Sequence, residues 1–168
     1  MSSSTSSSSS PSPQQIYDVF LSFRGEDTRG TFVAHLHEAL SKAAINTYID
    51  NLLEKGTELG PGLMLAIKCS RMSIVVFSKN YAESRWCLKE LEQIMTCHRN
   101  YRQVVLPVFY DVDPSAVRHQ TGAFGRALLE TAARRPSGGQ MMGNRLSIWT
   151  RDLTEAAHIS GWTTNNYQ

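Results

Sequence analysis

The sequence MSIVVFSKNYAESRWCLKELEQIMTC, residues 72–97, decides the fold of this chain. It opens with an apolar run rich in β-branched residues, 73–77, which is typical of a strand buried on both faces of a parallel sheet. Polar residues then predict a loop, and Ser84 is a suitable N-cap for the helix that follows. A buried strand joined to an amphipathic helix is the building unit of an α/β protein.

The helix that follows Ser84 has two faces when its residues are plotted at about 100° per residue. The apolar side chains fall on one arc and should face the sheet: Leu88, Leu91, Ile94 and Met95. The charged and polar side chains fall on the opposite arc and should face water: Arg85, Lys89, Glu92 and Gln93. Trp86 and Glu90 fit neither arc, and because they are one turn apart they should be neighbours on the seam.

This seam has two interpretations. The start of a helix that follows a strand lies at the ligand-binding edge of a parallel sheet. An aromatic ring beside a carboxylate could hold a flat, cationic ring and its sugar there. Trp86 could equally be a half-buried core residue and Glu90 a solvated one, since seam positions are common on amphipathic helices. Periodicity leaves both interpretations open.

Length and composition limit the class of protein. The 168 residues are enough for one domain. Residues 1–14 are nearly all serine and proline at their start and are expected to be a disordered tail, which leaves 15–168 for the domain. A signal peptide, a glycine for myristoylation after Met1 and an apolar run of membrane-spanning length are all missing from the sequence. The expected location is cytoplasmic, with the nucleus as a second one, and no membrane partner is expected.

Charge and cysteine content exclude further classes. The net charge of +2, from 17 basic and 15 acidic residues, is too balanced to predict nucleic-acid binding. Three cysteines, Cys69, Cys87 and Cys97, are an odd number and are expected to be free thiols. No cysteine or histidine spacing fits a metal site.

Strands and helices alternate along the chain, which predicts a parallel sheet with helices on both faces. Strands are expected at 16–23, 45–49, 73–77 and 104–110, and loops at 24–29, 51–62 and 135–143. Helices are expected after Thr28 or Thr31, at 63–69, after Ser84, at 116–134 with a break near Gly122, and at 146–159, which Gly161 should end. Pro107 implies that its strand lies at an edge or carries a bulge, because proline lacks a ladder donor.

Four segments together resemble the plant TIR domain, the Toll/interleukin-receptor type of domain found in plant nucleotide-binding, leucine-rich-repeat disease-resistance proteins. They are YDVFLSFRGEDTR at 17–29, SIVVFSKNYAESRWCLKEL at 73–91, VLPVFYDVDPSAVR at 105–118 and LTEAAHISGW at 153–162. The resemblance implies a flavodoxin-like, three-layer α/β fold with five parallel strands, so the fifth strand is expected near Trp162. Family members usually continue with a further amphipathic helix, and the chain is expected to lack it.

The resemblance also implies an activity, the cleavage of NAD⁺ at the nicotinamide–ribose bond on self-association, which triggers defence or cell-death signalling. Glu90 matches the family's catalytic glutamate. The same resemblance assigns substrate binding to a set of residues in three segments: Arg24, Gly25, Glu26, Lys55, Gly56, Ser78, Trp86 and Cys87. No tightly bound cofactor is expected; NAD⁺ is the substrate, and Mg²⁺ is a candidate accessory ion. For Arg24, a surface ion pair with Glu26 or Asp27 is an equal alternative.

Other TIR domains are the expected partners. Family members often carry a Ser-His pair on the first helix for self-association, and this chain has Ala34-His35, so that contact is expected to be weaker. The alternative function is a non-catalytic TIR–TIR interaction module. Two enzyme alternatives are weaker: Cys87 and His98 are three turns apart on one helix, and a phospho-receiver domain would need an aspartate where Ser78 stands.

Overall fold

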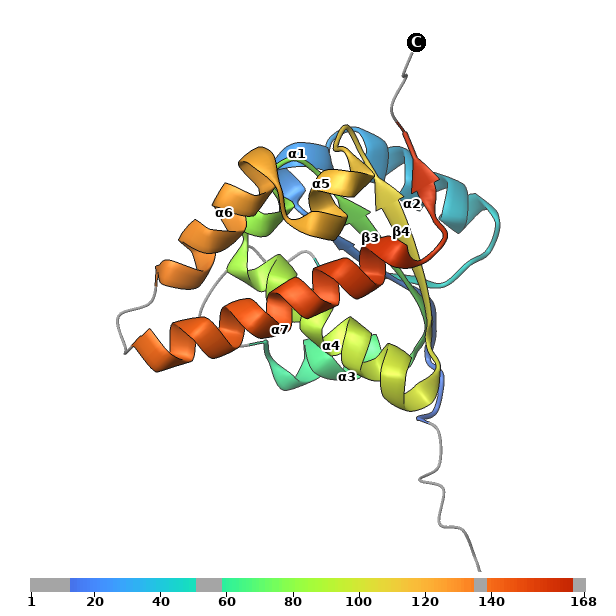
Figure 1. Ribbon diagram of the computed structural model, residues 1–168. Coiled ribbons are helices and arrows are strands. Elements are labelled where there is room, and N and C mark those ends of the chain that lie inside the picture. The colour runs from blue at the N-terminus through green and yellow to red at the C-terminus, as the bar shows by residue number, and fades with distance from the viewer. Residues whose placement is uncertain (1–12, 51–58, 135–138, 165–168) are drawn as a thin grey trace, which may run out of the picture.

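The computed structural model describes residues 13–50, 59–134 and 139–164, and Figure 1 shows them as a sheet between two layers of helices. All the strand pairs are parallel, in the order β2-β1-β3-β4-β5. The strands are β1 Tyr17–Phe23, β2 Thr47–Ile49, β3 Ser70–Phe77, β4 Val104–Phe109 and β5 Trp162–Thr163. The flavodoxin-like α/β fold and the fifth strand at Trp162 are confirmed. The expectations for the serine-rich tail and for a missing last helix lie outside the described residues.

Helices cover the two faces of the sheet unequally. Among the described residues, one face packs against α2, Phe32–Lys42, whose Val33 joins the apolar side chains of β1, β3 and β4. Five helices contribute to the core on the opposite face: α3 Pro61–Lys68, α4 Arg85–Tyr101, α5 Pro114–His119, α6 Gly122–Ala133 and α7 Gly139–His158. In Figure 1, α7 crosses the front of this layer and α2 lies behind the sheet at the right.

Four connections differ from the expected loops. Residues 24–29 include a four-residue helix, α1 Gly25–Thr28, in which the Arg29 N–H donates to the Gly25 carbonyl. A single turn has no apolar period, so sequence patterning cannot reveal it. The helix α3 begins at Pro61, which suits a first helical position, and α7 begins at Gly139, inside the expected loop. A short 3₁₀ turn, Tyr81–Glu83, precedes α4.

The helix α4 confirms the predicted cap and apolar face. The Ser84 hydroxyl accepts a hydrogen bond from the Cys87 N–H at 3.1 Å. The four predicted core residues are fully buried: Leu88, Leu91, Ile94 and Met95. The opposite face is only partly exposed, because α7 packs against it and Arg85 donates to the Thr131 carbonyl of α6 at 3.0 Å. The expectation that this face is directed wholly to water was therefore wrong.

The strand of Pro107 was expected to lie at an edge or to carry a bulge, and the structure shows neither: β4 lies between β3 and β5, and its register with β3 is unbroken. The Tyr110 N–H donates to β3 and the Phe109 carbonyl accepts from Thr164, beyond β5. Because backbone groups alternate sides along a strand, the Pro107 nitrogen points toward the β5 side. There β5 pairs only with Val108 and Phe109, so the missing donor falls where the ladder has not begun.

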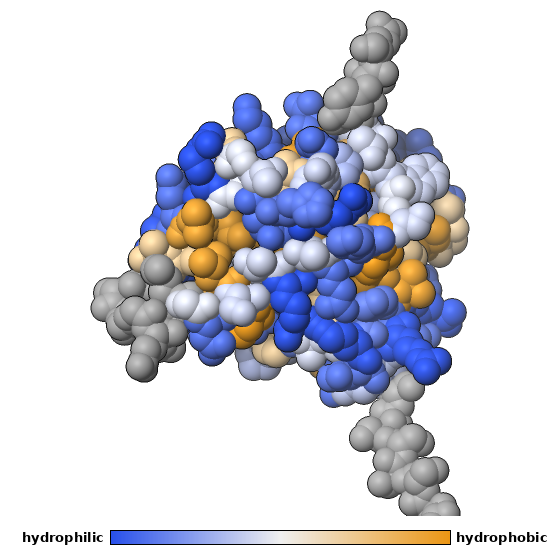
Figure 2. Space-filling model, viewed as in Figure 1, coloured by the Kyte–Doolittle hydropathy of each residue, from blue (hydrophilic) through white to orange (hydrophobic). Residues whose placement is uncertain are grey.

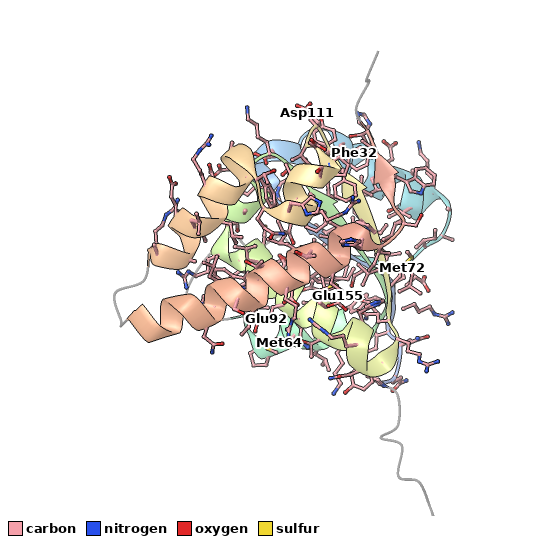
Figure 3. The ribbon with its side chains drawn as sticks, in the orientation of Figure 1. Phe32, Met64, Met72, Glu92, Asp111 and Glu155 are labelled. Carbon is pink, nitrogen blue, oxygen red and sulfur yellow. The ribbon has the colours of Figure 1, made fainter. Side chains whose placement is uncertain are left out.

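An ion pair ties α7 to α4. Asp152 on α7 is fully buried, and its carboxylate accepts hydrogen bonds from the Arg99 guanidinium of α4. Arg99 also lies 3.6 Å from the carboxylate of Glu155, which is labelled in Figure 3. Burial raises the pKa of Asp152 above its usual value, and the charge of Arg99 opposes that increase.

Candidate active site

A cavity of about 360 Å³ lies at the carboxyl ends of β1 and β2, against the first turns of α4. In a sheet of order 2-1-3-4-5, the strand order reverses beside β1, and ligands bind at this edge. The cavity is lined by Leu21, Phe23, Arg24, Gly25, Glu26, Arg29, Asp50, Trp86, Cys87 and Glu90. Six of the residues that the resemblance assigned to the site are therefore brought together: Arg24, Gly25, Glu26, Trp86, Cys87 and Glu90.

Glu90 is buried although it lines the cavity, with only 3% of its surface exposed. The interpretation of Glu90 as a solvated glutamate is therefore wrong. The charge of Glu90 affects the hydroxyl groups of two tyrosines, the buried Tyr81 and the half-buried Tyr48. Burial is the main cause that raises the pKa of Tyr81, and Cys87 and Glu90 raise it further. The pKa of Tyr48 is raised by burial first, then by Asp50, Tyr17 and Glu90.

Trp86 is half-buried on the same wall, one turn before Glu90. Its indole N–H donates a hydrogen bond to Oδ2 of Asp50 at 2.9 Å. Asp50 directly follows β2 and is 8% exposed. In the sequence, Asp50 directly follows the strand expected at 45–49, and nothing in the local pattern indicates that it meets a helix 36 residues away.

Two guanidinium groups line the cavity. Arg24 pairs with Glu26 at 3.2 Å, and since the Glu26 side chain is 80% exposed, water screens this pair. The ion pair with Glu26 expected as one alternative is therefore present, and Arg24 also lines the cavity, while its contact with a substrate stays a prediction. Arg29 donates to the Asp50 carbonyl at 3.2 Å and lies over the Phe23 ring at 5.0 Å.

Gly25 leaves room for Arg29. A Cβ built at Gly25 would lie 3.1 Å from Nε of Arg29, so a larger residue would press on that side chain. The resemblance implies that the loop 24–29 lines or gates the pocket, but Arg29 itself is not among the binding residues that it assigns; the structure places Arg29 in the cavity lining.

Ser78 does not line the cavity. Its hydroxyl donates to the Asp27 carboxylate at 2.5 Å, and the backbone and side-chain N–H groups of Asn80 donate to the same carboxylate at 3.0 Å. Ser78 therefore connects α1 to the turn after β3. This geometry supports a structural role for Ser78 and not the substrate contact that the resemblance assigned to it. Lys55 and Gly56 lie outside the described residues.

Cys87 is buried, and its thiol donates a hydrogen bond to the Phe23 carbonyl at 3.4 Å. His98 is far along α4, with Nδ1 2.8 Å from the Gln103 carbonyl. A thiol–imidazole pair between Cys87 and His98 is therefore excluded. Below the first turn of α4, the Tyr81 hydroxyl donates to the Cys87 carbonyl at 3.1 Å and lies 2.9 Å from the Ser22 hydroxyl.

A second hollow of about 320 Å³ lies between α3, α4 and α7, away from the sheet edge. Met64 and Glu92, both labelled in Figure 3, are on its walls. The charges there come from Lys89, Glu92 and Arg145, and none of these residues is buried. Of these two cavities among the described residues, the one at the sheet edge is the stronger candidate, because it is lined by two buried carboxylates and an aromatic ring.

In residues 13–50, 59–134 and 139–164, no three histidine, cysteine, aspartate or glutamate side chains gather to hold a metal ion. None of the helices in these ranges has the length and apolar character needed to span a bilayer. Ala34 and His35 are both exposed on α2, on the face of the sheet opposite α4.

The fold and the cavity define a TIR-type α/β domain, and comparison with known proteins agrees. Residues 16–168 match the family model for the TIR domain, so the chain belongs to the TIR domain family. It is 50% identical over 149 residues to the disease resistance protein RUN1 of Vitis rotundifolia, and the matched region covers 87% of this chain and 11% of that protein. It is 46% identical over 159 residues to the TMV resistance protein N of Nicotiana glutinosa, and this match covers 94% of this chain and 14% of that protein.

The fold also matches a solved structure. The TIR domains of the activated Roq1 resistosome, which directly recognizes the pathogen effector XopQ, superpose with a TM-score of 0.78 at 45% identity. The match covers 90% of this chain and 89% of that one. The chain spans about 11–14% of the length of the two resistance proteins described above.

Proposed function

We propose that this TIR domain cleaves NAD⁺ at the nicotinamide–ribose bond when it self-associates, and that the cleavage triggers plant defence or cell-death signalling in the cytoplasm or nucleus. One observation carries the proposal. Glu90 is 3% exposed and lines a cavity of about 360 Å³ together with an indole and two guanidinium groups.

A single carboxylate suits this reaction. Glycoside hydrolysis usually needs an acid to protonate a poor leaving group. Nicotinamide leaves as a neutral amine from a pyridinium, so no proton has to be donated. Positive charge develops on the ribose as the bond breaks, and a preorganised carboxylate with little exposure to water stabilises that charge more than it stabilises the ground state. Glu90 is suited to this role.

The other lining residues fit the rest of the dinucleotide. The half-buried ring of Trp86 offers a flat surface for a ring of the substrate. Arg24 and Arg29 offer planar donor groups, which suit the oxygens of a pyrophosphate. Mg²⁺ enters the proposal only as an ion carried by the pyrophosphate, because magnesium commonly binds through substrate phosphates. Comparison of the rates of nicotinamide release with and without a chelator tests whether Mg²⁺ takes part.

The decisive experiment compares Glu90→Gln with Glu92→Gln on the same helix. We expect Glu90→Gln to lower nicotinamide release from NAD⁺ by about 10²–10³-fold, the range for the loss of one stabilising group. Glu92 lines the second hollow and not this cavity, so its variant should keep the wild-type rate. Circular dichroism and the unfolding temperature check that both variants fold. A folded Glu90→Gln variant that releases nicotinamide at the wild-type rate would refute the assignment.

The alternative is a non-catalytic TIR–TIR interaction module. It is favoured by the likeness to TIR domains within an activated resistosome and by the exposure of Ala34 and His35. Rates measured over a wide range of protein concentration separate the two functions. A rate that rises more steeply than the concentration supports cleavage coupled to assembly. Self-association without nicotinamide release at any concentration supports the interaction module.

A further inference from the structure

We propose that Asp50 is a positioning residue, which fixes the indole of Trp86 on the cavity wall and thereby sets the affinity for the substrate. This inference rests on the proposed function, because the substrate it refers to is NAD⁺. Asp50 is not assigned a role by the resemblance, and it acts through Trp86 instead of touching the reacting atoms.

Asp50 is held from two directions. Its side chain accepts the hydrogen bond from the Trp86 indole at 2.9 Å, and its main-chain carbonyl accepts from the Arg29 guanidinium at 3.2 Å. One contact reaches α4 and the other reaches the segment after α1. Asp50 therefore joins both walls of the cavity at the end of β2, and it is 8% exposed.

The hydrogen bond fixes a ring that packing alone holds incompletely. Trp86 packs against the core but is only half-buried, and it also lines the cavity, so the core does not enclose it on all sides. A hydrogen bond from an N–H group to a carboxylate is charge-assisted and stronger than a bond between neutral groups. Without it, the indole could leave the orientation that presents its face to the substrate, and binding would have to restore that order.

Kinetics test the inference through four variants. Asp50→Ala removes the acceptor, Asp50→Asn keeps an acceptor oxygen without the charge, Trp86→Phe keeps a ring without the donor, and Asp50→Ala is combined with Trp86→Phe. We expect Asp50→Ala to raise KM for NAD⁺ about tenfold, the factor for one lost charge-assisted hydrogen bond, with kcat changed less than threefold. Asp50→Asn should recover most of the lost affinity.

The double variant decides whether the two residues act as a unit. If Asp50 works through Trp86, the double variant should have the KM of Trp86→Phe alone. Two results would overturn the proposal. One is a double variant whose change in KM equals the product of the changes in the two single variants. The other is an Asp50→Asn variant whose KM is raised as much as that of Asp50→Ala. The matched control is Asp18→Ala. Asp18 also carries a carboxylate that accepts a hydrogen bond beside β2, from the Asn46 N–H at 2.8 Å, but it does not line the cavity. The KM of Asp18→Ala should therefore equal the wild-type value.

A second measurement does not need the activity. The indole N–H proton of Trp86, assigned by its loss in Trp86→Phe, should resonate downfield in the nuclear magnetic resonance spectrum because it is bonded to a carboxylate. Asp50→Ala should move this resonance upfield, while Asp18→Ala should not. An unmoved resonance in Asp50→Ala overturns the positioning role even if NAD⁺ is cleaved. A moved resonance in a protein that cleaves no NAD⁺ supports the contact and refutes the proposed function.

Discussion

Gly161→Ala tests how β5 is attached to the sheet. Gly161 passes so close to β4 that an added Cβ would lie 2.1 Å from the Pro107 carbonyl oxygen and 2.6 Å from its ring. Real Cβ contacts are essentially never under 3.0 Å, so one backbone must move by about 0.9 Å. Both groups belong to rigid parts of their residues, so a change of rotamer cannot relieve the clash.

The movement would disrupt the short ladder of β5. This strand pairs at Trp162 and Thr163, and the Thr164 N–H donates to the Phe109 carbonyl at 2.9 Å. Losing two or three such bonds at about 1 kcal/mol each predicts a loss of about 2–3 kcal/mol in the free energy of unfolding. For a chain of this size, that corresponds to a fall of roughly 5–10 °C in the unfolding temperature.

Urea unfolding and amide hydrogen exchange at Thr164 measure the two consequences. The matched control is Gly143→Ala in α7, where an added Cβ meets nothing within 4 Å. That variant should gain up to about 1 kcal/mol, because alanine favours a helix interior over glycine. A Gly161→Ala variant with wild-type stability and an unchanged exchange rate at Thr164 would refute the steric argument.

Two further predictions concern buried polar groups. Tyr81→Phe removes the hydroxyl bonded to Ser22 and to the Cys87 carbonyl, so we expect a loss of about 2 kcal/mol in urea unfolding; a change below about 0.5 kcal/mol would contradict it. Asp152→Asn should change stability by no more than about 1 kcal/mol at pH 7, because the cost of burying the carboxylate offsets its attraction to Arg99. Since burial raises the pKa of Asp152, the folded state binds a proton more tightly than the unfolded state, so wild-type stability should rise relative to the variant as pH falls from 7 toward 4; a relative fall would show the wrong sign.

Patterns that repeat along the chain were predicted well. The helical period of α4 identified its buried residues, and Ser84 identified its start, because both signals come from residues close together in sequence. The resemblance placed Glu90 at the site, while periodicity left its role open. Its burial could not be predicted, since it depends on how the ends of β1 and β2 pack against the helix.

The contacts missed from the sequence join distant segments. Asp50 reaches Trp86, and Asp27 reaches Ser78 and Asn80, through single polar side chains with no repeat or spacing. Such pairs become visible only when the sheet brings the ends of its strands together. The prediction that the strand of Pro107 lies at an edge or carries a bulge failed for a related reason. The rule against proline in a central strand assumes that both neighbouring strands extend along its full length.

The hydrogen bonds received by Asp27 have a consequence for any ligand at the sheet edge. They clasp the turn after β1 to the turn after β3, so the separation of these two turns is set before anything binds. The two turns then lose little conformational entropy when a ligand binds, and more of the interaction energy remains available as affinity.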